Sequence, residues 1–174
     1  YEFKADLNAY LSGLGPSARV KSLAEVIDFN ERNRDAEMPY FGQERMHASQ
    51  ARGPLTDEAY RNAVRAIQRG NRQDGIDALM DRHDLDAIVA PTMGLSWMTD
   101  HIKGDRLGGG SSAGPAAIAG YPDVSVPMGF VSGLPVGVSF FGRAWSEPVL
   151  LRVAYGFEQA TNHRRPPTFP VTLG

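Results

Sequence analysis

The sequence predicts an α/β fold, because short apolar segments typical of strands alternate with longer segments that have helical periodicity. The order along the chain is helices, a strand, a loop, a helix, two strands and a last helix. A chain of 174 residues with 42% hydrophobic and 22% charged residues is typical of one ordinary globular domain with a sizeable core. We therefore expect helices packed on the faces of a sheet.

The composition excludes several classes of function. The chain has no cysteine, so it can contain neither a thiol nucleophile, nor a disulfide, nor a cysteine zinc site. A net charge of -2 gives no bulk electrostatic attraction to nucleic acid or to an anionic membrane, and no apolar run could span a bilayer. We expect a cytoplasmic protein without either partner. The chain starts at Tyr1 inside a helical pattern, so we also expect it to be a fragment or a processed piece.

Helical signals dominate the first third of the chain. Apolar residues at helical spacing predict a helix over residues 1–11, ended by Gly13. Ser22 followed three residues later by Glu25 is the signature of a capping box, which predicts the start of a second helix. Residues 36–54 are aromatic and interrupted by proline and glycine, so we expect an ordered loop with a short helix there.

A long helix is predicted from about Asp57, with Thr56 as its N-cap. Its apolar positions continue as far as Met80. Gly70 and Gly75 each cost about 1 kcal/mol relative to alanine inside a helix, so the pattern allows a break between them.

Three strands and a small helix follow. Residues 85–91 form a short apolar run that ends at a proline, and residues 123–130 and 134–142 form two further runs of strand character. The turn at 131–133 suits an antiparallel connection between the last two strands. Before this pair, the small residues 113–120 predict a helix.

The last helix has the clearest signals. Ser146 is its expected N-cap, and Pro148 is tolerated in the first turn because its missing N–H would have no helical partner there. Its expected buried stripe contains Leu150, Val153, Ala154, Phe157 and Ala160. We also expect Phe130, Phe140 and Phe141 to lie in the core rather than to contact a substrate.

Residues 93–112 show no periodicity and contain five glycines, and a loop of this length in a compact domain is often part of a site. The stretch GDRLGGGSSAG, residues 104–114, is its most unusual part. A phosphate-binding loop requires a lysine before its last serine or threonine, and Ala113 and Gly114 follow the serines here instead. A dinucleotide site requires a strand directly before the glycines, which the pattern lacks.

Two other interpretations of these glycines and serines remain. In one, Ser111 or Ser112 is a nucleophile, His101 its base and a nearby aspartate the residue that orients the base, although the nucleophile-elbow pattern is absent. In the other, the glycines permit a tight turn and one of the serines caps the following helix.

Three segments of the chain are recognisable together: DALMDRHDLDAIVAPT, SAGPAAIAGYPDVSVPMGF and GLPVGVSFFGRAWSEPVLLRVAYGFEQAT. The order and spacing of residues 120–122, 126–127 and 133–137 are their most specific feature. In these features the chain resembles the C-terminal part of amidase signature family enzymes, and the resemblance covers nearly the whole chain. The resemblance implies a mixed sheet core flanked by helices. It also implies hydrolysis of an amide carbon–nitrogen bond by a serine nucleophile, a second serine in a cis peptide and a lysine base.

In this family those three catalytic residues lie in the N-terminal half, so we expect residues 1–174 to be the C-terminal part of an amidase domain. We assign no catalytic residue in this chain, and we expect the isolated chain to be inactive. The resemblance implies that the strand ending in APT and the loop after it approach the substrate. Thr92, Asp100, Ser111 and Ser112 are therefore the expected substrate-binding residues.

The expected partners are a small-molecule amide, the missing N-terminal half of the same protein and, as an open alternative, further copies of the chain. No metal or organic cofactor is indicated, because a lysine–serine relay needs none. Two other functions remain open: the glutaminase subunit of a tRNA-dependent amidotransferase, which belongs to the same family, and a non-catalytic binding or scaffold module.

Overall fold

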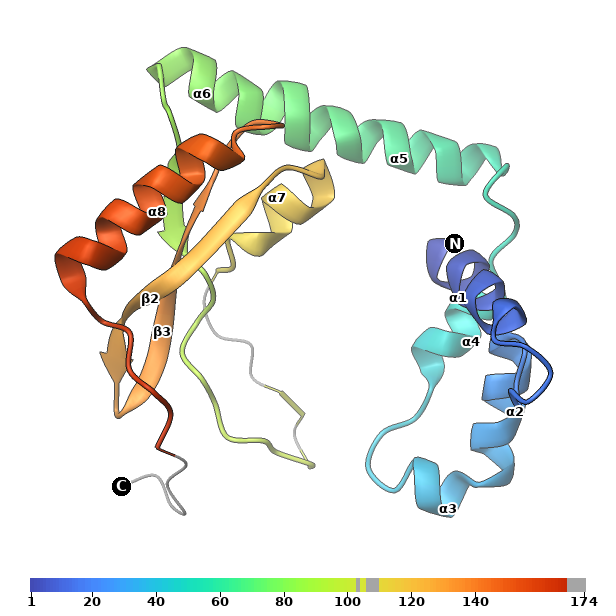
Figure 1. The fold of residues 1–174 in the computed structure, drawn as a ribbon. Coiled ribbons are helices and arrows are strands. Elements are labelled where there is room, and N and C mark those ends of the chain that lie inside the picture. The colour runs from blue at the N-terminus through green and yellow to red at the C-terminus, as the bar shows by residue number, and fades with distance from the viewer. Residues whose placement is uncertain (103, 106–109, 169–174) are drawn as a thin grey trace. The chain divides into compact units, whose positions relative to one another are not determined.

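The computed structural model of the chain describes residues 1–102, 104–105 and 110–168, and Figure 1 shows it as a ribbon. Helices and strands alternate along these residues, which confirms the predicted α/β class. The chain divides into two compact units, residues 1–64 and 65–174. Among the described helices, none is both long and apolar enough to cross a membrane.

The first unit is helical, and its second helix begins as its sequence predicts. The Ser22 hydroxyl accepts the N–H of Glu25 at 3.2 Å, and the Glu25 carboxylate accepts the N–H of Lys21 at 2.7 Å. The first bond satisfies a donor that a helix start leaves without a partner, and the second fixes the residue before the N-cap. The helices are α1 (Glu2–Gly13), α2 (Leu23–Arg32), α3 (Arg34–Glu37), α4 (Glu44–Gln50) and the beginning of α5 (Glu58–Asn71).

One buried amide joins α2 to the segment that leads into α4. Gln43 is 8% exposed, and its Nε2 donates to the carbonyl of Ile27 at 3.1 Å and to a Glu31 carboxylate oxygen at 2.9 Å. This bond and the neighbouring Arg34 and His47 hold the pKa of Glu31 below its usual value. The predicted loop with a short helix is thus present, and α4 is that helix.

The predicted long helix is continuous but not uniform. It begins at Glu58, so Asp57 rather than the expected Thr56 directly precedes it. After α5 the backbone widens into a π-helix, η1 (Arg72–Asp77), and then narrows again into α6 (Ala78–His83). A Cβ atom on Gly75 would lie 2.5 Å from the carbonyl oxygen of Gly70, so the wider turn depends on a glycine here.

Three strands form the sheet of the second unit in the order β1-β3-β2: β1 (Ile88–Pro91), β2 (Asp123–Val131) and β3 (Leu134–Phe141). Both pairs are antiparallel. The turn between β2 and β3 places Ser132 at a φ of 50° and Gly133 at 76°, the backbone that a tight two-residue hairpin turn requires. The predicted antiparallel connection is confirmed.

A β-bulge in β2 changes the register of this hairpin. Near the turn Val131 pairs with Leu134, but beyond the irregularity at Pro127 and Gly129 the pairing moves by one residue. As a result Ser125 lies opposite Ser139. Paired residues of neighbouring strands point to the same face, so the bulge brings two hydroxyls together on one face of the sheet.

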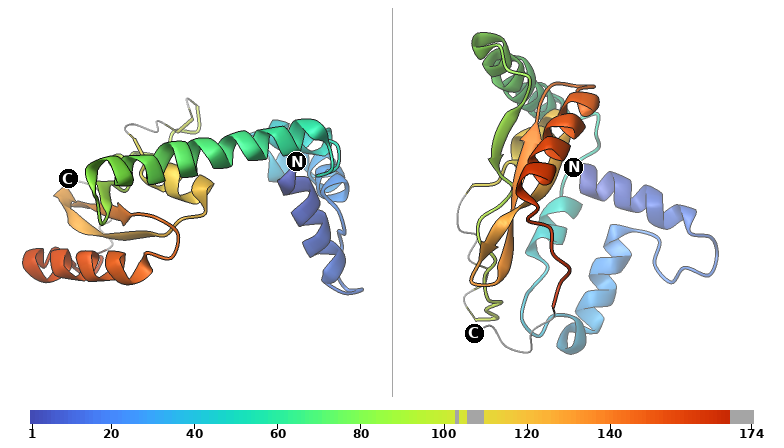
Figure 2. Two further views of the ribbon diagram at one scale, coloured as in Figure 1. Left: turned by 90° about the horizontal axis from the view of Figure 1, so that it is seen from above. Right: turned by 60° about the vertical axis from the view of Figure 1, so that its left-hand side comes forward.

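Helices cover both faces of the sheet, as Figure 2 shows from above. On one face lie η1, α6 and α7 (Ala113–Ala119), packed on Phe141. On the other face lies α8 (Glu147–Thr161), packed on Phe140. Neighbouring strand residues point to opposite faces of a sheet, so Phe140 and Phe141 each lie under the helices of a different face. Both are buried core residues, as predicted.

Three expectations for the C-terminal region need correction. Ser146 stands at the N-cap of α8, but its hydroxyl donates to the carbonyl of Arg143 at 2.7 Å and makes no cap bond. Leu150 and Ala154 are buried as predicted, whereas Ala160 is exposed because it lies in the last turn, beyond the sheet. Phe130 is only half-buried, and the Arg165 guanidinium lies 4.4 Å from its ring centre.

Candidate functional site

Thr92 follows β1 directly and connects it to three other residues of the sheet. Its Oγ1 lies 2.7 Å from the Ser125 hydroxyl and 3.0 Å from the Ser139 hydroxyl. Its N–H donates to the carbonyl of Gly137 at 2.9 Å. Ser139 is only 1% exposed, so the Thr92 hydroxyl satisfies a polar group that water hardly reaches.

Thr92, Ser125 and Ser139 form what we call the hydroxyl cluster, and the hydroxyls of Thr92 and Ser125 lie directly over Gly137. A Cβ atom on Gly137 would lie 2.8 Å from Thr92 Oγ1 and 3.1 Å from Ser125 Oγ. Glycine at this position therefore leaves the space that the cluster occupies.

The same threonine also anchors the glycine–serine loop. The Ser111 hydroxyl donates to the carbonyl of Thr92 at 3.1 Å, and the Ser112 hydroxyl makes a longer contact of 3.5 Å with the same oxygen. Ser111 Oγ also accepts the N–H of Ala113 at 3.3 Å, as a residue at a helix start does. The structure thus brings together three of the four residues expected to bind substrate.

A cavity of about 400 Å³ opens beside this serine pair. The serines stand at its polar side, and Phe141 and Pro115 form part of its apolar wall. Pockets of this size and mixed character are typical of small-molecule sites. The lining residues are Ala90, Pro91, Met93, Gly94, Gly110, Ser111, Ser112, Pro115 and Phe141.

Asp100, the fourth expected residue, lines a different cavity, which is formed by residues 97–102 and Gly104. Its Oδ1 accepts the N–H of Ile102 at 2.9 Å, the local bond of an Asx turn. Nearby, Asp105 accepts the indole N–H of Trp97 at 3.0 Å. The geometry therefore separates Asp100 from the cavity beside the serines.

Neither serine of the pair donates its proton to a basic side chain within the described residues. A serine nucleophile needs a base that removes its proton, whereas Ser111 and Ser112 direct theirs to a main-chain carbonyl. The described lysines bind carbonyl oxygens in the other unit: Lys4 those of Gln50 and Arg52, and Lys21 that of Gly15. Lys103 and the glycines at 108 and 109 lie outside the described residues.

Contacts from η1 hold α7, and with it the serine pair, on the sheet. Arg72 Nε donates to the carbonyl of Ala119 at 2.6 Å, and its guanidinium lies 5.8 Å from the ring centre of Tyr121. The Tyr121 hydroxyl in turn donates to Asp77 at 2.9 Å. Burial, and then this bond to Asp77, raise the pKa of Tyr121 above its ordinary value.

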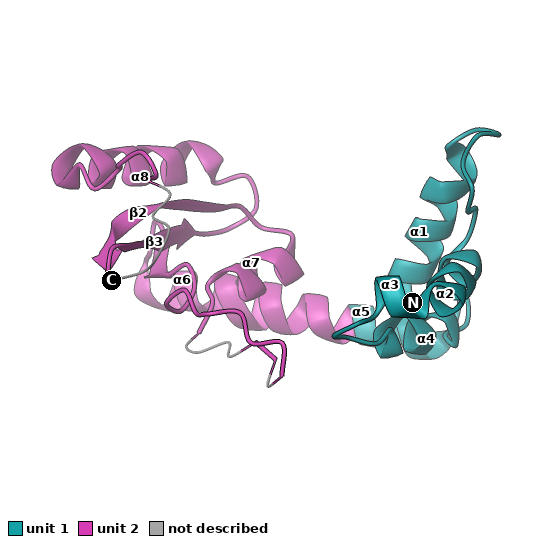
Figure 3. Ribbon diagram, turned by 90° about the horizontal axis from the view of Figure 1, so that it is seen from below, with its two compact units in different colours: residues 1–64 teal, residues 65–174 magenta. Residues whose placement is uncertain are grey.

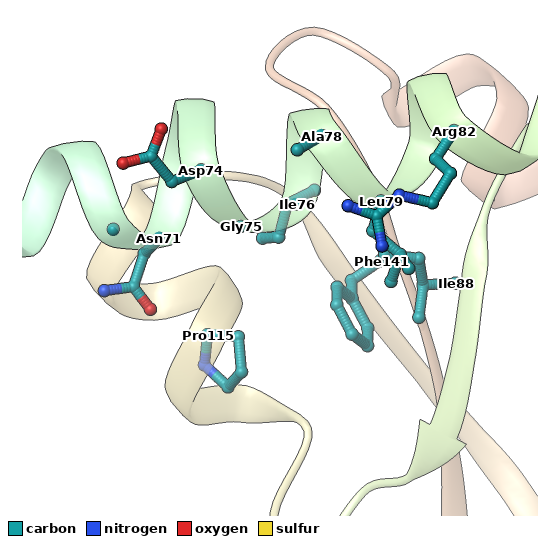
Figure 4. Close-up of a pocket in the computed structure, with 11 residues that line it drawn as sticks. Asn71, Asp74, Gly75, Ile76, Ala78, Leu79, Arg82, Ile88, Pro115 and Phe141 are labelled. Carbon is teal, nitrogen blue, oxygen red and sulfur yellow. The ribbon is translucent and has the colours of Figure 1, made fainter.

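A second cavity, of about 390 Å³, lies between this helical segment and α7, and Figure 4 shows its lining. It shares Pro115 and Phe141 with the first cavity. Asp74 points away from Pro115 in Figure 4 and forms an ion pair with Arg69 at 3.0 Å. Within the described residues, no group of three or more histidine and acidic side chains could hold a metal ion.

Fold and site together define an α/β protein in which a loop carrying a serine pair borders a cavity of about 400 Å³, and all of these residues lie in the second unit, magenta in Figure 3. The family model described as Amidase matches residues 1–151. The chain belongs to this amidase family.

Relatives and solved structures agree with this assignment. A probable amidase of Arabidopsis thaliana is 38% identical over 170 residues, which are 97% of this chain and 29% of that protein. The crystal structure of the peptide amidase from Stenotrophomonas maltophilia is 45% identical, with a TM-score of 0.87 over 98% of this chain and 34% of that one. An amidase family protein from Bacillus anthracis is 30% identical with a TM-score of 0.75. The chain thus spans about three-tenths of the length of the relatives it matches.

Sequence reasoning missed Ser125 and Ser139, the residues that hold Thr92. Both lie in strands where a single serine is typical of any partly polar face. The turn at 131–133 alone predicts a register in which Ser125 faces Phe140, because Val131 pairs with Leu134. Only the bulge, which Pro127 and Gly129 could have indicated, places Ser125 opposite Ser139.

Proposed function

We propose that this chain is the C-terminal part of an amidase domain, residues 1–174, and that the whole protein hydrolyses an amide carbon–nitrogen bond. The observation that carries the proposal is the serine pair anchored on Thr92 beside a cavity, in a chain of the amidase family. In this proposal Thr92, Ser111 and Ser112 form part of the substrate-binding wall. Asp100 belongs to the same proposal as a residue of the adjoining loop.

The groups that attack the carbonyl lie outside these 174 residues in this proposal. The chain matches only 29% of the Arabidopsis relative and 34% of the peptide amidase, so most of such an enzyme is not represented in it. The hydrogen bonds of Ser111, Ser112 and Lys4 support the same view, because all three side chains donate to main-chain carbonyls. A serine nucleophile, a second serine and a lysine supplied by the rest of the protein would complete the site.

The remainder of the protein is also the proposed partner of the second unit. Within the described residues β1 and β2 are the outer strands of the sheet, and each therefore has an unpaired edge. Val89 on β1 is 60% exposed, and Leu151 and Tyr155 on α8 are 58% and 64% exposed. Unpaired strand edges and apolar surface of this kind are usually covered by more protein.

An amidotransferase glutaminase subunit is a second candidate. Such a subunit of Desulforudis audaxviator is 53% identical, but only over 55 residues, or 30% of this chain. The match to the Arabidopsis amidase extends over 97% of the chain, which favours a stand-alone amidase. A non-catalytic scaffold is the third candidate.

The proposal also includes a cytoplasmic location and self-association of the enzyme. Cell fractionation tests the location, and sedimentation of the full-length protein tests the self-association.

Ammonia release by the full-length protein tests the proposed function. We expect turnover of simple primary amides without any added metal or tRNA. Turnover only of glutamine, and only with partner subunits present, would favour the amidotransferase. Substrate binding without any turnover would favour the scaffold.

A further inference from the structure

We propose that the cavity beside Ser111 and Ser112 is the subsite for an uncharged, apolar group of the amide substrate. This inference rests on the proposed function and names the substrate class that it leaves open. Of the nine described residues that line the cavity, none carries an ionisable side chain. Methionine, proline, alanine and phenylalanine side chains form most of its surface, and the two serines are its polar side chains.

Three other cavities of this unit have ionisable side chains in their lining. The cavity of Figure 4 has Asp74 and Arg82 in its lining. The cavity beside Tyr121 has Arg72 and Glu147, and the cavity of residues 97–102 and Gly104 has Asp100 and His101. Of these four cavities, the one beside the serine pair is therefore the one whose described lining carries no ionisable side chain.

The polar side of the cavity matches an amide. A hydroxyl that donates its proton to a carbonyl keeps lone pairs and can still accept a hydrogen bond. Ser111 Oγ, which donates to the Thr92 carbonyl, can therefore accept an N–H of the substrate. The apolar wall formed by Pro115 and Phe141 then faces the group next to the amide. Pro115 belongs to α7 and Phe141 is 5% exposed, so two regular elements hold this wall in place.

A charged group in this cavity would lose part of its hydration and gain no ion pair from the described lining residues. Such burial is costly, because an uncompensated charge is strongly disfavoured away from water. A neutral apolar group gains by the same transfer, in proportion to the area it buries. The cavity thus selects by charge as well as by size.

Kinetics of the full-length protein test this selectivity. The substrates are the N-acetylated primary amides of leucine, glutamate and lysine, which differ only in the side chain. We expect kcat/KM for the leucine compound to exceed those for the charged compounds by about tenfold or more. Equal values, or a preference for a charged side chain, would overturn the subsite.

A pair of matched variants locates the selectivity in this cavity. Met93 lines it and is 48% exposed, whereas Met98 is 74% exposed and lines the cavity that contains Asp100. We expect Met93→Glu to lower kcat/KM for the leucine compound about tenfold and to raise the relative rate for the lysine compound. Met93→Gln adds polarity but no charge, so it should lower kcat/KM for the leucine compound less than Met93→Glu does. Met98→Glu is the control and should leave the order of the substrates unchanged.

The outcomes separate the two proposals. If Met93→Glu keeps the wild-type order of substrates, or if Met98→Glu changes it equally, the subsite is wrong while the amidase function stands. If the full-length wild-type protein releases no ammonia, either from the three compounds or from other simple amides, the proposed function is wrong, and the subsite with it.

Discussion

At the scale of residues, Thr92 is the connection between the sheet and the glycine–serine loop. Its hydroxyl contacts two serines of the sheet, and its carbonyl accepts from two serines of the loop. Side chain and main chain of one residue thus serve two different elements. A change at Thr92 should therefore affect substrate binding as well as stability.

We expect Thr92→Val in the full-length protein to lower the free energy of unfolding by about 1–3 kcal/mol, because it leaves the buried Ser139 hydroxyl without this partner. We also expect KM to rise more than kcat falls, because the Thr92 carbonyl that anchors Ser111 and Ser112 is held less firmly once the side chain loses its own two bonds to the sheet. Thr92→Ser keeps the hydroxyl and should restore most of both quantities. Denaturant titration and steady-state kinetics measure them, and an unchanged KM in Thr92→Val would contradict the role of the hydroxyl cluster.

Tyr121 allows a test by pH. Its pKa is raised in the folded chain by burial and by the bond to Asp77, so the neutral, bonded phenol stabilises the fold. This contribution is fully present below the unfolded pKa of about 10 and is lost as the pH rises through the higher folded pKa. We expect Tyr121→Phe to cost about 1 kcal/mol at neutral pH and less at strongly alkaline pH. Denaturant titrations of both proteins at several pH values check this, and a constant difference would contradict it.

At the scale of elements, the π-helical turn η1 depends on one glycine and not on its neighbour. A Cβ atom at position 75 meets the Gly70 carbonyl at 2.5 Å, whereas a Cβ atom at position 70 meets nothing within 4 Å. We expect Gly75→Ala to destabilise the protein by about 1–3 kcal/mol, because backbone must move. Gly70→Ala should stabilise it by up to about 1 kcal/mol through helix propensity. Thermal unfolding measures the stability of both variants. Equal melting temperatures would contradict the different roles of the two glycines.

Sequence patterns predicted the elements well where the signal is local. The capping box at Ser22 and the hairpin turn at Ser132–Gly133 formed as expected, because each involves neighbouring residues only. Signals that depend on tertiary contacts were less informative. Ser146 has the position of an N-cap, but its hydroxyl donates to Arg143 instead. The bulge at Pro127–Gly129, which decides which serines meet, changes the register by a single residue.

The candidate site was predicted in part for the same reason. Thr92, Ser111 and Ser112 were expected to bind substrate because the end of a strand and a glycine-rich loop are visible in the sequence, and the structure brings these three residues together. Ser125 and Ser139 were missed because their role appears only once the strands are aligned. Asp100, which was expected to bind substrate together with Thr92 and the serine pair, lines a different cavity in the described residues.

At the scale of the whole molecule, the sequence predicted one domain, and the described residues form two compact units. The boundary at Val64 and Arg65 lies inside α5, where an uninterrupted helical pattern gives no sign of it. The second unit contains the sheet, the serine pair and the cavity beside it. We therefore place the proposed substrate wall in that unit.

The exposed apolar residues of the second unit lead to a prediction about the remainder of the protein. Trp145 is 88% exposed, and the exposed surfaces of Val89, Leu151 and Tyr155 add to it. We expect the 174-residue chain to bind a hydrophobic fluorescent dye strongly, and the full-length protein to bind it several times more weakly per mole. Comparable dye binding would contradict the proposal that the remainder covers these surfaces.

The most direct test of the central claim is amide turnover by the purified 174-residue chain beside the full-length protein. A circular dichroism spectrum first establishes that the chain is folded. We predict ammonia release by the full-length protein and none by the folded chain, because the proposed function places the attacking serine and its base outside these residues. Turnover by the 174-residue chain alone, abolished by Ser111→Ala, would contradict the account.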